Sequence, residues 1–237
     1  MMTPKARTEF FRILRAANPE PKSELEYSSP FELLVAVVLS AQATDKGVNL
    51  ATRKLFPEAN TPTAIVALGE ERLRGFVQTI GLFRMKAKNV FGLSKMLVEE
   101  HGGEVPRTRD ALERLPGVGR KTANVVLNVA FGEPTMAVDT HIFRVANRTG
   151  LAPGKDPLAV EAKLLGTVPK EFRLHAHHWL ILHGRYTCVA RKPKCGACPV
   201  FGPCGFGDKA KFASPPRSPS SPRRPSSPRR RGSSPKK

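Results

Sequence analysis

A lysine beside a glycine-containing turn is the first feature of this sequence that could do chemistry. In Leu115–Leu127 (Leu-Pro-Gly-Val-Gly-Arg-Lys-Thr-Ala-Asn-Val-Val-Leu), Pro116-Gly117 predicts a turn and Gly119 the start of a helix. Glycines leave backbone N–H groups uncovered beside a helix N-terminus, which is where anions bind. Such a terminus favours acidic residues by roughly a few tenths of a kcal/mol, yet Arg120 and Lys121 occupy the first turn. We therefore expect a polyanion to bind here.

Two other motifs share features with this stretch. Lys121-Thr122 resembles the end of a phosphate-binding P-loop, which needs Gly directly before the Lys and another Gly five residues earlier. Those positions hold Arg120 and Leu115, so a P-loop is excluded. An ordinary helix–turn–helix with Gly at its corner stays open on these residues alone.

Four cysteines form the second candidate site. Cys188, Cys195, Cys198 and Cys204 have the spacing Cys-x6-Cys-x2-Cys-x5-Cys, with glycines and prolines between them. Clustering of every cysteine in one short loop indicates a metal site rather than disulfides in a reducing compartment. Spacing alone permits tetrahedral zinc or a [4Fe–4S] cluster, and of the two it favours zinc.

Other polar positions have an ordinary structural interpretation beside a functional one. Asp139 precedes a predicted helix and is expected to be its N-cap. The segment Ser40–Asp45 follows a very apolar helix and could be a simple loop, and Leu82 beside Gly81 could be a core residue. Four histidines, His175, His177, His178 and His183, share one predicted helix, and we interpret them as packing or phosphate-contact residues.

Composition favours nucleic acid as the partner. The 237 residues include 39 Lys and Arg against 20 Asp and Glu, a formal charge of +19. Ten of the basic residues and none of the acidic ones lie in 209–237, so residues 1–208 still carry about +9. The longest apolar run, Leu33–Leu39, is too short to span a bilayer, and charged residues interrupt the N-terminal segment. We expect a soluble, intracellular protein, cytoplasmic and associated with the nucleoid.

The periodicity predicts an all-α fold. Ser29-Pro30 with Glu32 predicts a capping box before an apolar, central helix that runs to about Leu39. A final long helix is expected over 171–183, with Gly184 as its stop. From Lys209 the chain repeats Ser-Ser-Pro-Arg-Arg and has almost no apolar residues, which predicts a disordered basic tail able to add phosphate contacts.

Taken together, these motifs resemble the endonuclease III family, the bifunctional DNA glycosylase/AP lyases of the helix–hairpin–helix superfamily. The resemblance covers about residues 5–208. It is carried by the hairpin Leu115–Leu127, Ala137–His141, Ser40–Asp45, Thr79–Leu82, His177–Tyr186 and the four-cysteine loop. It implies two helical domains with DNA bound in the cleft between them. One is a six-helix barrel over residues 22–133, and the other joins residues 1–21 to 134–208 around a [4Fe–4S] cluster. The cluster then displaces zinc as the expected cofactor, and 209–237 has no counterpart in the family pattern.

The same resemblance assigns roles to individual residues. Lys121 would be the nucleophile that forms a Schiff base with the sugar, and Asp139 would stabilise the sugar cation and assist proton transfers. Gln42 would fill the space left by a flipped pyrimidine, and Leu82 would wedge the opposite strand. Gly117, Gly119 and Arg120 would hold the DNA backbone. The implied enzyme is a monomer that removes oxidised or damaged pyrimidines from double-stranded DNA and nicks the abasic site by β-elimination.

Three rival functions remain on the sequence. The adenine-mismatch glycosylases share the hairpin, the Asp and the cysteine spacing, but typically lack the nucleophilic Lys and have a further C-terminal domain. The 8-oxoguanine branch keeps a Lys but usually lacks the cluster. A non-enzymatic DNA-binding module is disfavoured because Lys121 and Asp139 occur together.

Overall fold

All regular structure in the described part of the chain is helical. The computed structural model describes residues 1–213, and these contain α-helices and two 3-10 helices but no β-strand. This confirms the all-α prediction. The elements are α1 (Pro4–Ala17), α2 (Pro30–Ser40), α3 (Asp45–Leu55), α4 (Pro62–Leu68), α5 (Glu70–Val77), α6 (Phe83–His101), α7 (Arg109–Arg114), α8 (Arg120–Phe131), α9 (Thr140–Thr149), α10 (Pro157–Thr167), η1 (Lys170–Phe172), α11 (Arg173–Tyr186), η2 (Cys195–Ala197) and α12 (Lys209–Ala213).

Local sequence signals explain where the helices begin. The N-cap side chains of α1, α2, α3, α4, α7, α9 and α10 each accept a hydrogen bond from a first-turn N–H group. The expected capping box of α2 differs in one detail. The Ser29 hydroxyl accepts from the Glu32 N–H at 3.1 Å, but the Glu32 carboxylate reaches one residue further back and binds the N–H and hydroxyl of Ser28, both at 2.7 Å.

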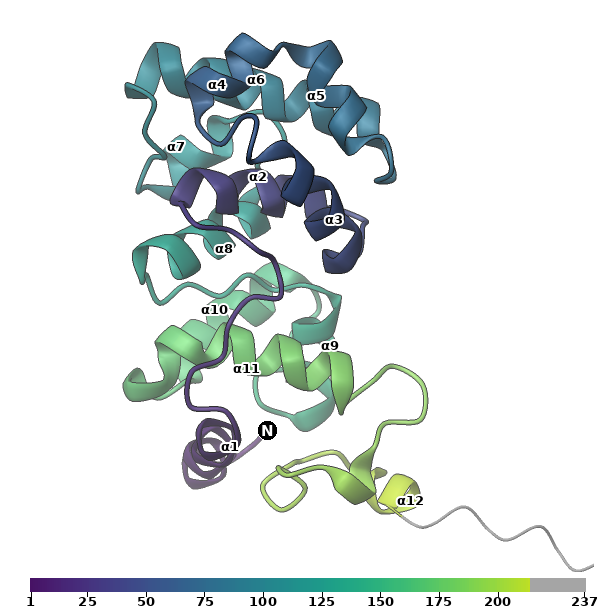
Figure 1. Cartoon of the computed structure of the whole chain (residues 1–237). Helices are drawn as coiled ribbons and strands as arrows, with labels where there is room; N and C mark the ends of the chain where they lie inside the picture. Colours follow the sequence, from purple (N-terminus) through teal and green to yellow (C-terminus); the bar gives the residue numbers. More distant parts are fainter. Residues whose placement is uncertain (214–237) are drawn as a thin grey trace, which may run out of the picture.

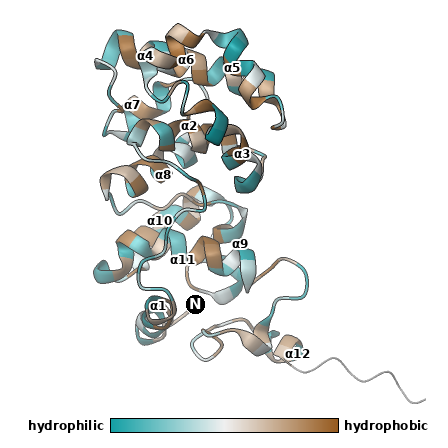
Figure 2. Cartoon of the chain, viewed as in Figure 1, coloured by the Kyte–Doolittle hydropathy of each residue, from teal (hydrophilic) through white to brown (hydrophobic). Residues whose placement is uncertain are grey.

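The first hydrophobic core is built around α2, whose residues Phe31–Leu39 are all buried. Helices α3 to α8 surround it and form the upper body in Figure 1, and the apolar colouring of α2 in Figure 2 marks its central place. Residues 22–133 hold seven α-helices rather than six, because Gly69 ends α4 and α5 begins directly after it. Gly69 has φ +80°, a conformation that favours glycine.

The second core joins the N-terminal helix to the C-terminal half. Phe10 and Phe11 of α1 are fully buried against residues of α9, α10 and α11, including Trp179. The indole N–H of Trp179 donates to the Asn18 carbonyl at 2.7 Å, which ties the end of α1 to α11. The chain therefore passes between the two bodies twice, before α2 and after α8 (Figure 1).

Gly184 does not end α11, as the sequence had led us to expect. The helix continues to Tyr186, and Gly184 is buried inside it. A Cβ atom at this position would lie 2.9 Å from the His141 Cβ and 3.2 Å from the His141 carbonyl oxygen. The glycine thus allows α11 to pack closely on α9, and a tertiary contact overrides its role as a stop signal.

The C-terminal segment also differs from expectation at its start. Lys209–Ala213 forms α12, which packs on η2, whereas the sequence predicted a disordered tail from Lys209. The Lys209 ammonium donates to the carbonyls of Phe201 and Cys204 at 2.7 and 2.6 Å, so the cysteine loop holds the helix. The rest of the predicted tail, 214–237, lies outside the described residues.

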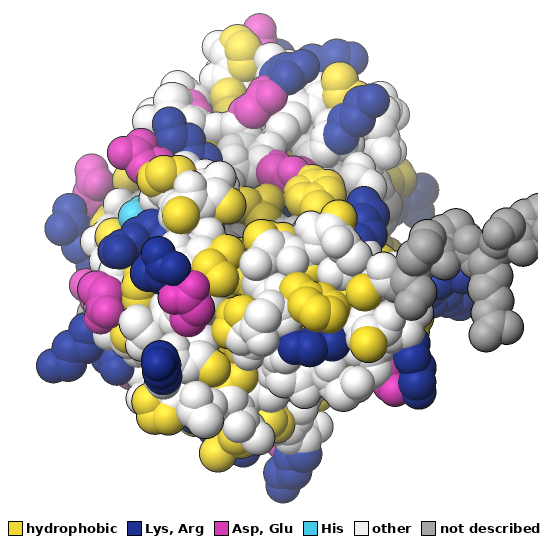
Figure 3. Space-filling view, turned by 90° about the horizontal axis from the view of Figure 1, so that it is seen from below, with side chains coloured by type: hydrophobic (Ala, Val, Ile, Leu, Met, Phe, Trp, Pro, Cys, Tyr) yellow, Lys and Arg dark blue, Asp and Glu magenta, His cyan; other side chains and the backbone are white. Residues whose placement is uncertain are grey.

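Membrane-spanning potential and surface charge can both be assessed over residues 1–213. None of the helices there has both the length and the apolar character needed to cross a membrane. Viewed from below, the molecule carries Lys and Arg side chains all round its face, with small apolar patches between them (Figure 3).

Candidate active site and nucleic-acid interface

The hairpin before α8 has the geometry of an anion site. Gly117 has φ +78°, and a Cβ there would lie 2.7–2.9 Å from Asn89 side-chain atoms, so both the backbone conformation and the available space require glycine. Leu115 and Val118 are buried and anchor the turn in the first core. Gly119 is the N-cap of α8 and supplies no side-chain hydrogen bond, and no acidic residue lies in the first turn. The first amide groups of α8 are therefore left to an outside partner.

Lys121 stands on the first turn of α8 at the edge of a cavity of about 190 Å³. Thr122, Val125 and Val129 continue the same wall at helical spacing. A second wall comes from the end of α2 and the turn after it, with Val37, Ser40 and Gln42. The cavity thus has a mixed lining, with valine side chains beside charged and polar groups.

The third wall belongs to α11. His177, Ile181 and Arg185 follow one another at intervals of four residues and face the same cavity. Because α8 and α2 belong to the first core and α11 to the second, the cavity lies between the two bodies. Sequence reasoning had not assigned His177 or Arg185 to a cavity, because their neighbours across it are far away in the chain.

Gln42 and Leu82 share an unusual backbone conformation. Their φ angles are +53° and +60°, and both side chains are exposed, Leu82 by 60%. A left-handed conformation of a non-glycine residue costs on the order of 1–3 kcal/mol and is concentrated at functional sites. A Cβ built at Gly81 would lie 4.0 Å from the Gln42 carbonyl oxygen, so the two turns are neighbours. Leu82 is not the core residue that a glycine turn alone would favour.

Asp139 caps α9. Its Oδ1 accepts from the N–H groups of His141 and Ile142 at 2.9 and 2.8 Å, which is the N-cap role expected from the sequence. Among the described residues Oδ2 has no hydrogen bond. Asp139 is half-buried and lies outside the lining of the cavity that contains Lys121.

Arg120 is held by an acidic partner. Its Nε and Nη2 donate to Glu161 of α10 at 2.9 and 2.8 Å, a bidentate pair, and Arg109 lies 3.5 Å from the same carboxylate. The Glu161 side chain is only 7% exposed. The pair connects α8 of the first core to α10 of the second, next to Lys121.

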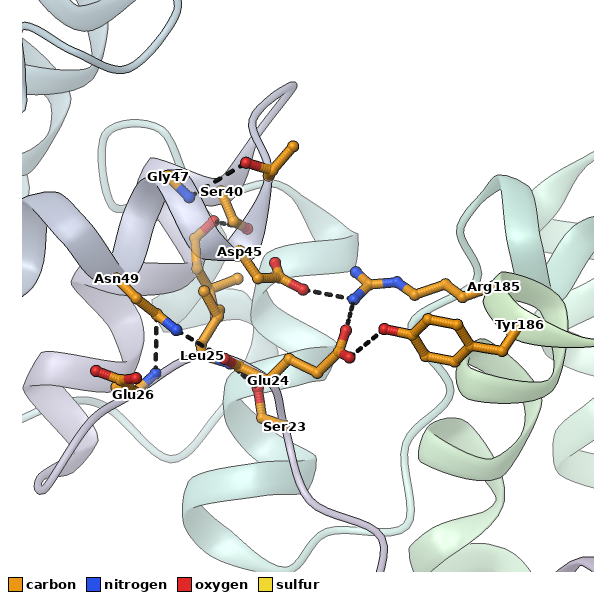
Figure 4. Close-up of polar contacts among 12 residues, drawn as sticks. Ser23, Glu24, Leu25, Glu26, Ser40, Asp45, Gly47, Asn49, Arg185 and Tyr186 are labelled. Carbon is orange, nitrogen blue, oxygen red and sulfur yellow. Dashed lines mark hydrogen bonds and ion pairs between the residues drawn. The ribbon is translucent and has the colours of Figure 1, made fainter.

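A second connection between the bodies lies at the mouth of the cavity. The Arg185 guanidinium binds Asp45 at 2.5 Å and also Glu24, and the Tyr186 hydroxyl donates to Glu24. Figure 4 shows Arg185 and Tyr186 reaching from α11 to Asp45 of α3 and to the segment before α2. The two bodies are therefore joined by ion pairs at two places, of which the Arg185 pairs belong to the cavity lining.

The four cysteines form a loop with the chemistry of an iron–sulfur site. None of the four is in a disulfide, and burial raises the pKa of the Cys198 thiol to about 11, assisted by the charges of the other three. Two cations lie against the loop: Arg148 Nη1 is 3.6 Å from Cys188 Sγ and donates to the Val189 carbonyl, and the positive charge of Lys209 lowers the pKa of Cys204, which burial raises more strongly. These cations can offset the charge of bound thiolates.

The four cysteines lie within residues 188–204 of the chain. Within residues 1–213, no three Cys, His, Asp or Glu side chains converge as the ligands of one metal ion would. A [4Fe–4S] cluster does not need such convergence, because each cysteine binds its own iron.

Comparisons with known proteins agree with this geometry. The family model described as HhH-GPD superfamily base excision DNA repair protein matches residues 35–170, and the iron-sulfur binding domain of endonuclease III matches residues 188–204. The chain is 61% identical over 211 residues to Endonuclease III of Haemophilus influenzae, covering 89% of this chain and 100% of that one. It is 60% identical over 208 residues to Endonuclease III of Escherichia coli, covering 88% and 99%.

Solved structures give the same result. A trapped Endonuclease III–DNA covalent intermediate superposes with a TM-score of 0.82 at 45% identity, covering 89% of this chain and 100% of that one. A thermostable thymine-DNA glycosylase superposes with a TM-score of 0.75 at 25% identity, covering 86% and 98%.

Proposed function

This chain belongs to the endonuclease III family of the HhH-GPD superfamily of base excision DNA repair proteins, and from its site we propose that Lys121 attacks the sugar of a damaged pyrimidine nucleotide. The enzyme is a DNA glycosylase with AP lyase activity, its partner is DNA, and its cofactor is a [4Fe–4S] cluster. The observation that carries the proposal for Lys121 is its place at the edge of the cavity between the two bodies, beside the hairpin.

Docking of DNA is proposed to start at the hairpin. The uncapped first turn of α8, with Gly117 and Gly119, would bind a backbone phosphate and fix the register of the duplex without reading sequence. Arg120 is a further candidate, and its ion pair with Glu161 has to open before it can reach a phosphate.

Base flipping is proposed to use Gln42 and Leu82. A glycosidic carbon inside the stack cannot be attacked, so the nucleotide must leave the duplex. Two exposed side chains on neighbouring left-handed turns are set to enter the duplex, Gln42 in the vacated space and Leu82 in the opposite strand. The strained backbone of both turns is typical of a functional site, and exposed side chains there could form a wedge that holds a kinked duplex open.

The chemical step that we propose is nucleophilic substitution followed by elimination. The unprotonated Lys121 amine forms a bond to C1′ of the sugar, and the C1′–N bond breaks with its electron pair leaving on the base, which takes up a proton. The nitrogen then loses a proton, and the C1′–O4′ bond breaks with its electron pair leaving on O4′, which takes up a proton, so that the C1′=N bond of the Schiff base forms. Loss of a proton from C2′ then expels the 3′ phosphate, and water releases the lysine.

Asp139 is proposed to support this step by its charge. A carboxylate at the N-terminus of α9 is stabilised by the helix dipole and by the two N–H groups that bind Oδ1. Oδ2 is left to stabilise the cationic sugar and to take part in proton transfers. The cap role and the catalytic role use different oxygens of one side chain.

The [4Fe–4S] cluster would be held by Cys188, Cys195, Cys198 and Cys204, and its contribution is structural, shaping the basic loop between the first two. We also propose the domain division 22–133 against 1–21 plus 134–208, which the two separate cores support. The enzyme would act at the nucleoid.

Borohydride trapping tests the role of Lys121. Wild type with abasic-site DNA should give a stable covalent adduct on reduction, and Lys121→Gln should give none. Lys155→Gln is a matched control, since Lys155 is exposed and lies away from the cavity. An adduct with the Lys121 variant would show that another amine is the nucleophile.

For Asp139, substitution by Asn separates the two roles. The amide oxygen can still accept from the first turn of α9, so thermal stability should be kept, while base removal should slow strongly because the charge is lost. Full turnover in this variant would leave only the cap role. Turnover on duplexes with thymine glycol, uracil, or adenine opposite 8-oxoguanine distinguishes the proposed substrate class from its rivals.

A further inference from the structure

A buried histidine faces the cavity and has no part in the steps above. His177 lies on the wall formed by α11, together with Ile181 and Arg185. The residue is 3% exposed, and neither ring nitrogen has a hydrogen bond within the described part of the chain. Its Nδ1 is closed off from the cavity, as is Nδ1 of His178, so Nε2 is the nitrogen of His177 that a bound group can reach. A buried ring nitrogen without a partner costs roughly 1–3 kcal/mol, and a contact made only in the functional complex is one explanation for keeping such a group beside a cavity.

The imidazole is neutral. Burial lowers the pKa of His177 to about 3, and the positive charges of His178, Lys121 and Arg185 lower it further in the same direction. A neutral imidazole carries one N–H donor and one acceptor nitrogen. It adds no positive charge to the surroundings of the Lys121 amine, which has to be uncharged to react.

The walls around His177 indicate what kind of partner it would meet. Val37, Val125, Ile181 and Leu182 give the cavity an apolar lining of the kind that covers the faces of a flat ring. Every ordinary pyrimidine base carries at least one ring carbonyl oxygen, whereas adenine carries none. A single buried donor therefore separates these two classes of base, because the wrong base leaves the donor unpaired.

We propose that His177 donates a hydrogen bond to a ring carbonyl oxygen of the flipped pyrimidine and so contributes to the choice of base. This inference rests on the proposed function, because it takes the cavity to be the site of the flipped base. It assigns His177 to recognition of the base, whereas Lys121 and Asp139 act on the sugar. The two roles can be measured separately, because an abasic site has a sugar but no base.

The test compares two reactions of the same variants. His177→Phe should lower kcat/KM for removal of a damaged pyrimidine on the order of 10- to 100-fold and leave cutting of abasic-site DNA at the wild-type rate. His177→Gln, which keeps an N–H donor, should recover most of the loss. His175→Phe is the control, since His175 is on the same helix but outside the cavity lining.

A second measurement needs no variant. Wild type should excise more slowly a pyrimidine analogue in which hydrogen replaces the ring carbonyl oxygen, and this holds even if His177→Phe fails to fold. Equal excision of the analogue and the parent base, or equal loss of base removal and abasic-site cutting in the Phe variant, would overturn the inference. Failure of wild type to remove any pyrimidine would instead refute the proposed function.

Discussion

Replacing Glu161 by Gln should destabilise this protein more than replacing an exposed glutamate. The Glu161 carboxylate is 7% exposed, binds Arg120 through two hydrogen bonds of 2.9 and 2.8 Å, and lies 3.5 Å from Arg109. Gln keeps the shape and one acceptor but removes the charge shared by two guanidiniums. We expect a loss of about 1–3 kcal/mol in the free energy of unfolding, because a charge-assisted buried pair is replaced by a weaker one.

Thermal unfolding measures this loss. For a folded region of this size, each kcal/mol corresponds to about 2–4 °C in Tm, so a drop of roughly 2–12 °C is expected. Glu71→Gln is the control, since Glu71 pairs with Arg74 on a single helix and its side chain is 90% exposed. An exposed pair of this kind contributes about 0–1 kcal/mol.

The same variant also tests how Arg120 is used. Since Arg120 precedes Lys121 in the first turn of α8, loosening its link to α10 should slow formation of the borohydride-trapped adduct. DNA affinity distinguishes two possibilities: it should rise if Arg120 leaves Glu161 to bind a phosphate, and should not rise if the pair persists in the complex. A loss of Tm in Glu161→Gln no larger than in Glu71→Gln would refute the proposed stabilising role of the ion pair between Glu161 and Arg120.

Three further predictions follow from other sites. Gly117→Ala should cost at least about 1–2 kcal/mol and weaken DNA binding, because of its positive φ and the close contact that a Cβ would make, whereas Gly119→Ala, with open space around it, should cost less than about 1 kcal/mol in thermal unfolding. Burial lowers the pKa of His177 to about 3 and the pKa values of His178 and His183 to about 4, so the unfolded chain binds more protons below pH 6.5. Stability should therefore fall as pH drops from about 6.5 towards 4, by up to about 1.4 kcal/mol per pH unit for each of the three histidines, and His178→Phe should reduce the slope in denaturant titrations by about one third. Ending the chain after Asp208 removes α12 from the cysteine loop, so the visible absorbance of the cluster should bleach faster under oxidant than in the full chain, and an equal rate would contradict a protective role for this helix.

Most of the helices could be predicted from local sequence patterns. Proline at the first helical position and a Ser, Thr or Asp cap before it act within one turn, so the starts of helices such as α2 and α10 follow from neighbouring residues. The hairpin was equally local, because Gly117 is required by its own φ angle. The prediction that Gly184 ends its helix was wrong for the opposite reason, because a glycine is needed there for the close contact with His141 on another helix.

Only part of the candidate site could be predicted from the sequence. Lys121 and the cysteines stood out by residue type and spacing, but the ion pair of Arg120 joins residues 41 positions apart, and nothing in the hairpin itself points to Glu161. From the sequence His177 could not be distinguished from an ordinary packing histidine, and the structure shows that it lines the same cavity as Lys121. Backbone strain at Gln42 and Leu82 likewise has no sequence signature, because both residue types normally avoid that conformation.

The position of the N-terminal helix in the second core determines the order in which parts of the chain can fold during synthesis. Every helix of the first core lies between Pro30 and Phe131, so that body can form its contacts while the ribosome is still making the C-terminal half. Helix α1 is made first, but Phe10 and Phe11 must wait for Trp179 and its neighbours, about 170 residues later. Until then an amphipathic helix with exposed phenylalanines is attached to a finished domain, and closing that long loop is the last large entropic step. The nascent chain is therefore most exposed to chaperones and to misassembly at the end that emerges first.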